Sequence, residues 1–255
     1  MFYIESNGYA ATSWLARSIS SLSALKCFHG SRAIPEGLPL GSELDLNERD
    51  FIAKLSSIEH DGDGVCVGAI HAKFPIEINS VIKEFGGHYS IAIRNPVSRI
   101  VSCASWAKNK FEKKEFFTID KESLALAYQY CSSPLTWDDI LFSYAIFHVV
   151  SYDVWTYSNK GQFDAIFQME RYTTEPEYFV AMIQEVTKNQ ITLNENEVDS
   201  IFSNGPTNSH SGNANKDIAE VFSELTDNQK RMIQGLFAVN SHLKGVYAEL
   251  GYNMI

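Results

Sequence analysis

Short apolar runs alternate along this chain with longer segments of helical pattern, and this alternation limits the possible folds more than any other feature of the sequence. The apolar runs that predict buried strands lie at residues 2–5, 24–28, 65–70, 89–93 and 163–169. Helices are predicted at residues 11–22, 47–58, 76–85, from Pro96 onward, and at 121–131, 137–157, 176–188, 195–203, 227–237 and 241–250. Strands that alternate with helices predict an α/β fold of three layers, with a mostly parallel central sheet flanked by helices. The length is typical of one domain, which we expect to span residues 1–255.

Two segments outside this regular alternation carry weaker expectations. Residues 108–118 are polar and basic, so we expect a loop or a ragged helix there. Their lysines predict either a solvated surface or a positive rim that attracts an anionic ligand. In the long predicted helix that follows, the spacing of four aromatic residues favours packing in the core over a platform for a sugar: Trp137, Tyr144, Phe147 and Trp155.

The composition narrows the class of protein. The chain has 255 residues, 45% hydrophobic and 20% charged, with a formal net charge of −10. An acidic chain makes a nucleic-acid partner a poor expectation, because affinity for DNA depends on neutralising phosphates. The four cysteines are widely spaced, so we expect buried thiols and no metal site. The apolar runs are too short for a signal peptide or a membrane span, and we therefore expect a cytoplasmic protein.

The turn after the first predicted strand joins small residues to a predicted helix. Residues 8–13 read "GYAATS". A strand, a turn and a helix in this order bring several backbone N–H groups and the positive end of the helix dipole to one place. The pattern fits an anion site, often for a phosphate, but on this segment alone an ordinary turn capped by a hydroxyl side chain is the better explanation.

A second segment, "RNPVSRIVS" at residues 94–102, follows the fourth predicted strand. The strand would deliver Arg94 to its carboxyl end, and Pro96 would open the next helix. Arginine offers a fork of donors that matches a phosphate, and Ser98 and Ser102 share one face of the helix. Anion binding and an ion pair at the strand end both explain the arginine.

Together the two segments resemble the sulfotransferase family that uses 3′-phosphoadenosine 5′-phosphosulfate (PAPS). The family's first loop reads P-K-S-G-T-T-W, and here it reads "GYAATSW". The second family motif reads R-N-P-x-D-R-x-x-S, and here Ser98 takes the place of the aspartate. Three further segments resemble the family in the same order along the chain: "AIHAKF", "MERYTTEPE" and "SHSGNANKDIAEVFSELTDNQ". The resemblance implies a P-loop-like sulfotransferase fold.

The resemblance also implies roles for individual residues. The residues that would cradle the 5′-phosphosulfate are Ala10, Ala11, Thr12, Ser13 and Trp14. Arg94 and Ser102 would hold the 3′-phosphate, and Ser211, Gly212 and Lys216 would close over it. His71 would be the general base that takes the proton from the acceptor, a task that suits histidine because it titrates near neutral pH. Without the family, a structural histidine at a strand end explains this residue as well.

Tyr9 occupies the place of the family's loop lysine. A phenol donates one hydrogen bond but carries no charge at neutral pH. Another cation, such as Arg17, Lys73 or Lys108, is one explanation, and an alignment shifted by one or two residues is a second. The third is a protein that binds the nucleotide with weak activity or none.

Three hypotheses follow. The first is a sulfotransferase that moves a sulfuryl group from PAPS to a hydroxyl or amine of a small molecule, sugar or lipid, without a metal. The second is a non-catalytic or weakly active module of the same fold that binds PAPS or its desulfonated product. The third, a P-loop kinase, ranks last because the glycine-lysine-serine/threonine loop is absent from the sequence. The sequence leaves the acceptor and the oligomeric state open.

Overall fold

The computed structural model describes residues 1–30, 47–61, 65–72, 74–115, 118–132, 134–203 and 217–253. These residues fall into two compact units, one within Met1–Ile93 and Lys160–Asn208 and the other within Arg94–Asn159 and Ser209–Ile255. The prediction of one domain over the whole chain stays a prediction.

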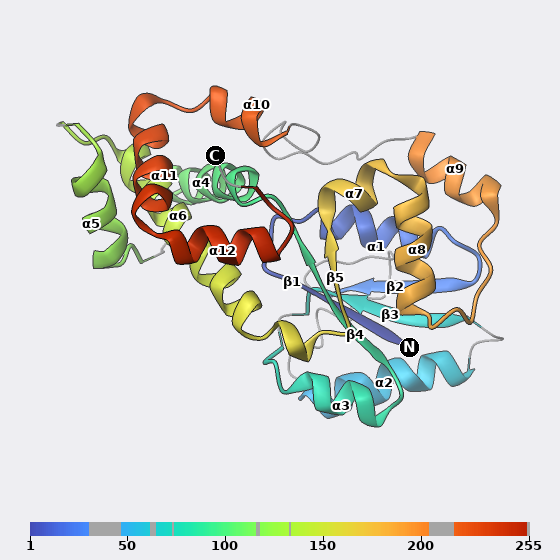
Figure 1. The fold of residues 1–255 in the computed structure, drawn as a ribbon. Coiled ribbons are helices and arrows are strands. Elements are labelled where there is room, and N and C mark those ends of the chain that lie inside the picture. The colour runs from blue at the N-terminus through green and yellow to red at the C-terminus, as the bar shows by residue number, and fades with distance from the viewer. Residues whose placement is uncertain are drawn as a thin grey trace. The chain divides into compact units, whose positions relative to one another are not determined.

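The first unit is built around a five-stranded parallel sheet. Its strands are β1 (Phe2–Ser6), β2 (Leu25–His29), β3 (Cys66–Ile70), β4 (His88–Ile93) and β5 (Ala165–Gln168), in the spatial order β2-β3-β1-β4-β5 (Figure 1). The registers pair Ile4 of β1 with Ile70 of β3 and Ser6 of β1 with Ala92 of β4. The chain leaves β1 toward β2 and leaves β4 toward β5, so the strand order reverses between β1 and β4. Ligands in open α/β sheets bind beyond the carboxyl ends of the strands at such a switch point.

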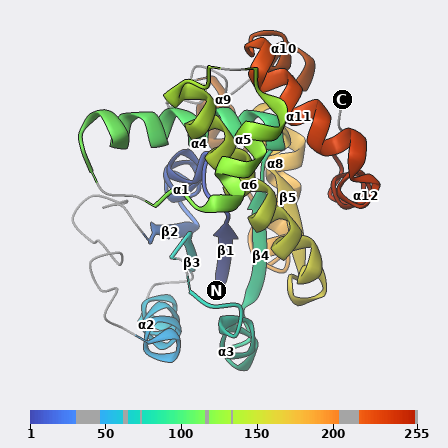
Figure 2. The same cartoon turned by 90° about the vertical axis from the view of Figure 1, so that its left-hand side faces the viewer.

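Helices cover both faces of this sheet. The helices of the first unit are α1 (Thr12–Ser20), α2 (Glu48–Asp61), α3 (Ile78–Glu84), α7 (Met169–Thr174), α8 (Pro176–Val186) and α9 (Glu195–Ser203), with a short 3-10 helix at Lys160–Gln162. Helix α1 lies on one face and α2 and α3 lie on the other, in both views (Figures 1 and 2). The central strands are buried throughout, as expected for a parallel sheet that is covered on both sides. The predicted three-layer α/β arrangement is confirmed for this unit.

The second unit is helical. It contains α4 (Pro96–Glu112), α5 (Lys121–Tyr130), α6 (Trp137–Ser158), α10 (Ile218–Ser223), α11 (Asp227–Val239) and α12 (Ser241–Glu249). Helix α6 packs against α4, α5, α11 and α12, and it begins at a capping box formed by Thr136 and Asp139. Among the described residues, no helix is both long enough and apolar enough to cross a membrane.

Several sequence-based expectations need refinement or correction. Residues 108–112 continue helix α4, which is the helical one of the two alternatives expected for this segment, because their lysines and glutamate are good helix formers. The side chains of Trp137 and Phe147 are 55% and 41% exposed, where core packing was expected. Two short helices, α7 and α10, were not expected from the sequence. Helix α10 is explained by Asp217, whose carboxylate accepts a hydrogen bond of 2.7 Å from the backbone N–H of Glu220.

Candidate functional site

The turn between β1 and α1 has a strained backbone. Gly8, Tyr9 and Ala11 have positive φ angles of 83°, 58° and 49°. The left-handed conformation costs a non-glycine residue roughly 1–2 kcal/mol, so neighbouring contacts must hold the turn in place. One such contact is the hydrogen bond that the buried hydroxyl of Tyr172 donates to the carbonyl of Ala10. No described side chain caps helix α1 at its N-terminus, which leaves its first-turn N–H groups for an anion or water.

Trp14 fixes helix α1 to the rest of the first unit. Its side chain is buried, and its ring stacks on that of Tyr172 with 6.3 Å between the centroids. Phe179 and Phe202 meet the same ring edge-on at 6.1 and 6.2 Å. The role that these contacts give Trp14 is packing, and its predicted contact with a nucleotide stays a prediction.

Strand β1 holds the turn that carries His71 at three points. The backbone N–H of His71 donates to the carbonyl of Ile4 at 2.9 Å, and the N–H of Ala72 donates to the hydroxyl of Tyr3 at 3.0 Å. The third point is Glu5, whose Oε1 lies 3.4 Å from Nδ1 of His71. His71 itself has a φ of 58°, and strained non-glycine residues of this kind are concentrated at functional sites.

His29, the last residue of β2, contacts both the first residue of α1 and the turn that carries His71. Its Nε2 lies 2.9 Å from the hydroxyl oxygen of Thr12, and its ring meets that of His71 edge-on with 5.9 Å between the centroids. The parallel register sets His29 beside Ile70, the residue before His71. The first unit therefore brings Thr12 and His71, which are far apart in the sequence, to the same group of side chains.

Sequence reasoning missed both Glu5 and His29. Glu5 is 6% exposed, and its carboxylate accepts hydrogen bonds from the hydroxyl of Tyr3 at 2.7 Å and from the N–H of Ser6 at 2.8 Å. Burial, followed by the nearby Glu5 carboxylate, raises the pKa of Tyr3 well above its usual range, so the phenol stays protonated and donates. The available signal was a charged residue at the end of an apolar strand, because such a residue is rarely buried without a partner.

Gly30 packs directly against the turn that carries His71, and we expect Gly30→Ala to disturb it. A Cβ atom at this position would lie 2.3 Å from Cα of Ala72, a backbone atom that cannot rotate away. We expect a loss of about 1–3 kcal/mol in the free energy of unfolding, as for other overpacked sites. Chemical denaturation measures the loss. Gly161→Ala is the matched control, because nothing lies within 4 Å of its added Cβ, and equal stability of the two variants would contradict the prediction.

The arginine segment lies in the second unit, at the start of helix α4. Asn95 caps this helix by accepting hydrogen bonds from the N–H groups of Val97 and Ser98 at 2.8 and 3.3 Å, and Pro96 is its first residue. Two residues of the motif are thus accounted for by the helix start.

The two arginines of this motif, Arg94 and Arg99, differ in their surroundings. Arg99 is 1% exposed and forms an ion pair with the buried Asp153, which gives it a structural role. Arg94 donates from Nη1 to the hydroxyl of Ser102 at 3.1 Å, and both side chains are buried. The structure therefore brings together the two residues predicted to hold the 3′-phosphate.

Some predicted residues lie outside the described part of the chain. Ser211, Gly212 and Lys216, which were predicted to close over the 3′-phosphate, fall in this group, and so does Lys73. Of the other cations considered in place of a loop lysine, Arg17 is exposed on α1, and Lys108 forms an ion pair of 3.0 Å with Asp138 in the second unit.

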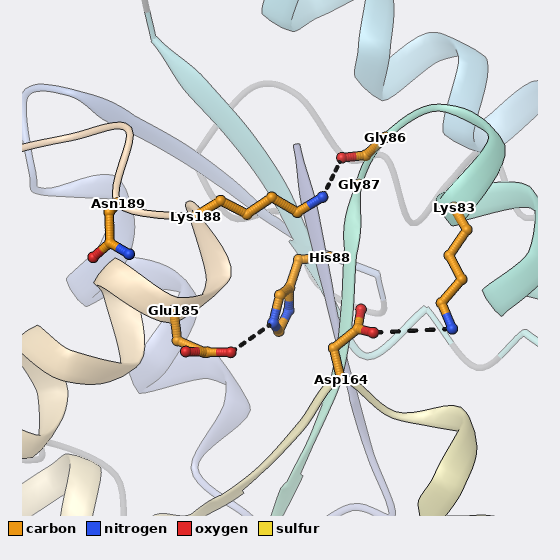
Figure 3. A pocket seen from close by; sticks show the side chains of 8 residues that line it. All are labelled: Lys83, Gly86, Gly87, His88, Asp164, Glu185, Lys188 and Asn189. Atoms are coloured by element: carbon orange, nitrogen blue, oxygen red, sulfur yellow. Dashed lines mark hydrogen bonds and ion pairs between the residues drawn. The ribbon is translucent and has the colours of Figure 1, made fainter.

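A separate pocket of about 500 Å³ lies at the amino ends of the strands, where β4 begins, away from the residues described above. His88 points into it between Glu185 and Asp164, with Lys188 and Lys83 at its sides (Figure 3). The Nε2 of His88 lies 3.5 Å from a Glu185 oxygen, and burial lowers the pKa of His88. Two carboxylates and two lysines line this pocket beside His88, so their charges balance, and none of the predicted site residues belongs to it.

Comparison with known proteins gives little support for a family. No family model matches the chain, and no curated protein sequence matches it significantly. Among solved structures, the chain is similar to mouse sulfotransferase SULT7A1 complexed with PAP, with 13% identity over 97% of this chain and 88% of that one. The TM-score is 0.46, and a likeness at this level does not establish a shared function.

Proposed function

We propose that the chain is a sulfotransferase that transfers a sulfuryl group from PAPS to a hydroxyl or amine of a small molecule, sugar or lipid. In this proposal the turn at residues 8–13 binds the 5′-phosphosulfate, and Arg94 and Ser102 bind the 3′-phosphate. His71 is the general base.

One observation carries the proposal. Thr12, from the loop that would bind the donor, and His71, which would be the base, both contact His29. They meet beyond the carboxyl ends of β1, β2 and β3, the edge of the sheet where ligands bind in open α/β folds. A reaction of this class needs the donor's phosphosulfate and the base close together, because the attacking oxygen must reach the sulfur while it loses its proton.

The contacts of the arginine segment at residues 94–102 also support the proposed function. Asn95, Pro96 and Arg99 have structural roles in or next to helix α4. Arg94 and Ser102 combine a guanidinium fork with a hydroxyl donor in one hydrogen-bonded pair, and such a pair suits the oxygen atoms of a phosphate. The hydrogen bond between them sets the orientation of the guanidinium before a ligand arrives.

The chemistry that this site would perform is an in-line displacement. The acceptor oxygen attacks the sulfur, the bond from sulfur to the 5′-phosphate oxygen breaks, and 3′-phosphoadenosine 5′-phosphate (PAP) leaves with the electron pair. The acceptor proton passes to His71. By analogy with phosphoryl transfer, the protein contributes mainly positioning and stabilisation of charge.

Tyr9 favours a second candidate function, a nucleotide-binding module of the same fold with weak activity or none. It stands where the family has a lysine and brings no positive charge to the leaving phosphate. Loss of one such stabilising group costs on the order of 2.7–4 kcal/mol of activation free energy by analogy with an oxyanion hole. Binding of PAP without measurable transfer would select this second function.

Calorimetric titration with PAP and then with adenosine 5′-phosphate tests both functions. We expect PAP to bind more than about tenfold more tightly, because one desolvated phosphate pair contributes more than about 1.4 kcal/mol. Arg94→Gln should remove most of this preference, whereas Arg231→Gln, an exposed arginine of the same unit, should keep it. Equal affinity of the wild-type protein for the two nucleotides would exclude both candidate functions.

A further inference from the structure

Glu5 is a buried carboxylate at the carboxyl end of β1, where a charged group has to be compensated. Its Oε2 accepts from Tyr3 and its Oε1 accepts from the N–H of Ser6, and both donors are neutral. The Nδ1 atom of His71 lies beside Oε1 and can supply a third donor. Burying a carboxylate costs less when its oxygens accept hydrogen bonds, so a proton on Nδ1 of His71 lowers the cost of burying Glu5.

The imidazole of His71 has a buried nitrogen that faces this carboxylate. Its Nδ1 is enclosed and makes no hydrogen bond with the other described residues, yet Oε1 of Glu5 lies 3.4 Å away. This separation is a few tenths of an ångström beyond a normal hydrogen bond, and catalytic hydrogen bonds are often long before the substrate binds. The three contacts between β1 and the turn at His71 hold the two groups in this orientation.

We propose that Glu5 is a positioning residue for His71, holding its proton on Nδ1 so that Nε2 is left unprotonated toward the acceptor. The inference rests on the role of His71 in the proposed function. During transfer the acceptor proton passes to Nε2 as the bond from oxygen to sulfur forms and PAP leaves. The Glu5 carboxylate stabilises the positive charge that the imidazole gains.

The tautomer of His71 tests this proposal without any turnover. Nitrogen-15 NMR of the full chain with ring-labelled histidine distinguishes protonated from unprotonated ring nitrogens, and the His71 signals are assigned by their loss in His71→Asn. At a pH where the ring is neutral, we expect the Nδ1–H tautomer to predominate in the wild-type protein. The Nε2–H tautomer in the wild-type protein would overturn the proposal, whether or not the protein proves to be a sulfotransferase.

Glu5→Gln gives the corresponding functional test. Glutamine keeps the shape of the side chain but removes the negative charge that favours a proton on Nδ1, so we expect the tautomer to shift toward Nε2–H. Turnover should fall about 10- to 100-fold, as for other groups that orient a functional histidine, with PAP affinity within about twofold of wild type. Glu185→Gln is the matched control, because it also removes a carboxylate 3.5 Å from a histidine nitrogen, but at the amino ends of the strands (Figure 3).

The outcomes separate failure of the inference from failure of the proposed function. An unchanged tautomer in folded Glu5→Gln overturns the positioning role. A shifted tautomer with unchanged turnover overturns it as well, because the orientation of the ring would then not matter for the reaction. If PAP does not bind to the wild-type protein, the proposed function fails, and the tautomer of His71 still reports on the pairing with Glu5.

Discussion

Replacing His71 should lower sulfuryl transfer by about 10²- to 10⁴-fold, the usual contribution of a general base. The acceptor hydroxyl would then have to lose its proton to water as it attacks the sulfur. We expect PAP affinity to stay within about twofold of wild type, because in the proposed function His71 contacts the acceptor and not the nucleotide. The measurement is transfer from radiolabelled PAPS to the best acceptor in a panel of phenols, sugars and amines, alongside calorimetry with PAP.

The choice of variant decides whether this result is clear. His71 has a φ of 58°, and alanine is strained in this region, whereas asparagine adopts it more readily. His71→Asn therefore keeps the turn but offers no base, and His71→Ala and His71→Asn should lose similar turnover. His60→Ala, an exposed histidine at the end of α2, is the control. Turnover of His71→Asn within threefold of wild type would exclude His71 as the base.

Much of the fold was predictable because its strands are buried and apolar. The first strand was predicted at residues 2–5 and spans Phe2–Ser6, and the fourth was predicted at residues 89–93 and spans His88–Ile93. The end of α4 was less predictable, since polar residues fit a helix on the surface as well as a loop. Strand order was not readable from the sequence, because pairing depends on contacts between distant segments.

The same reason explains which parts of the site were missed. The turn at residues 8–13, His71 and Arg94 follow strands and could be found segment by segment. Glu5 and His29 matter because β1 and β2 both pair with β3, which brings their ends to the turn at His71. Their roles are set by this strand order, so a reading along the chain treats them as ordinary members of apolar strands.

The largest expected effect on stability lies in the second unit, at the ion pair between Arg99 and Asp153. Both side chains are buried, at 1% and 3% exposure, and the hydroxyl of Tyr247 donates to the second oxygen of Asp153 at 2.8 Å. Burial acts to lower the pKa of Arg99, and the Asp153 carboxylate more than offsets it, so that the pKa is raised. The pair joins α4, α6 and α12, three helices that are distant in the sequence.

We expect Asp153→Ala to cost about 3–5 kcal/mol of the free energy of unfolding, because it leaves a buried guanidinium without its carboxylate. Denaturant titration of the full chain, followed by circular dichroism, measures this loss. Asp138→Ala is the control on the same helix, since Asp138 is exposed and pairs with Lys108 at the surface, and surface pairs contribute about 0–1 kcal/mol.

The double variant Arg99→Met, Asp153→Leu separates charge from packing. If the single variant is unstable because a charge is left unpaired, removing both charges should restore at least half of the lost stability, since apolar replacements of a buried pair are often neutral or stabilising. A double variant as unstable as Asp153→Ala would contradict this account. The stability of the unit would then depend on the shape of these side chains, with the hydrogen bond from Tyr247 as the main loss.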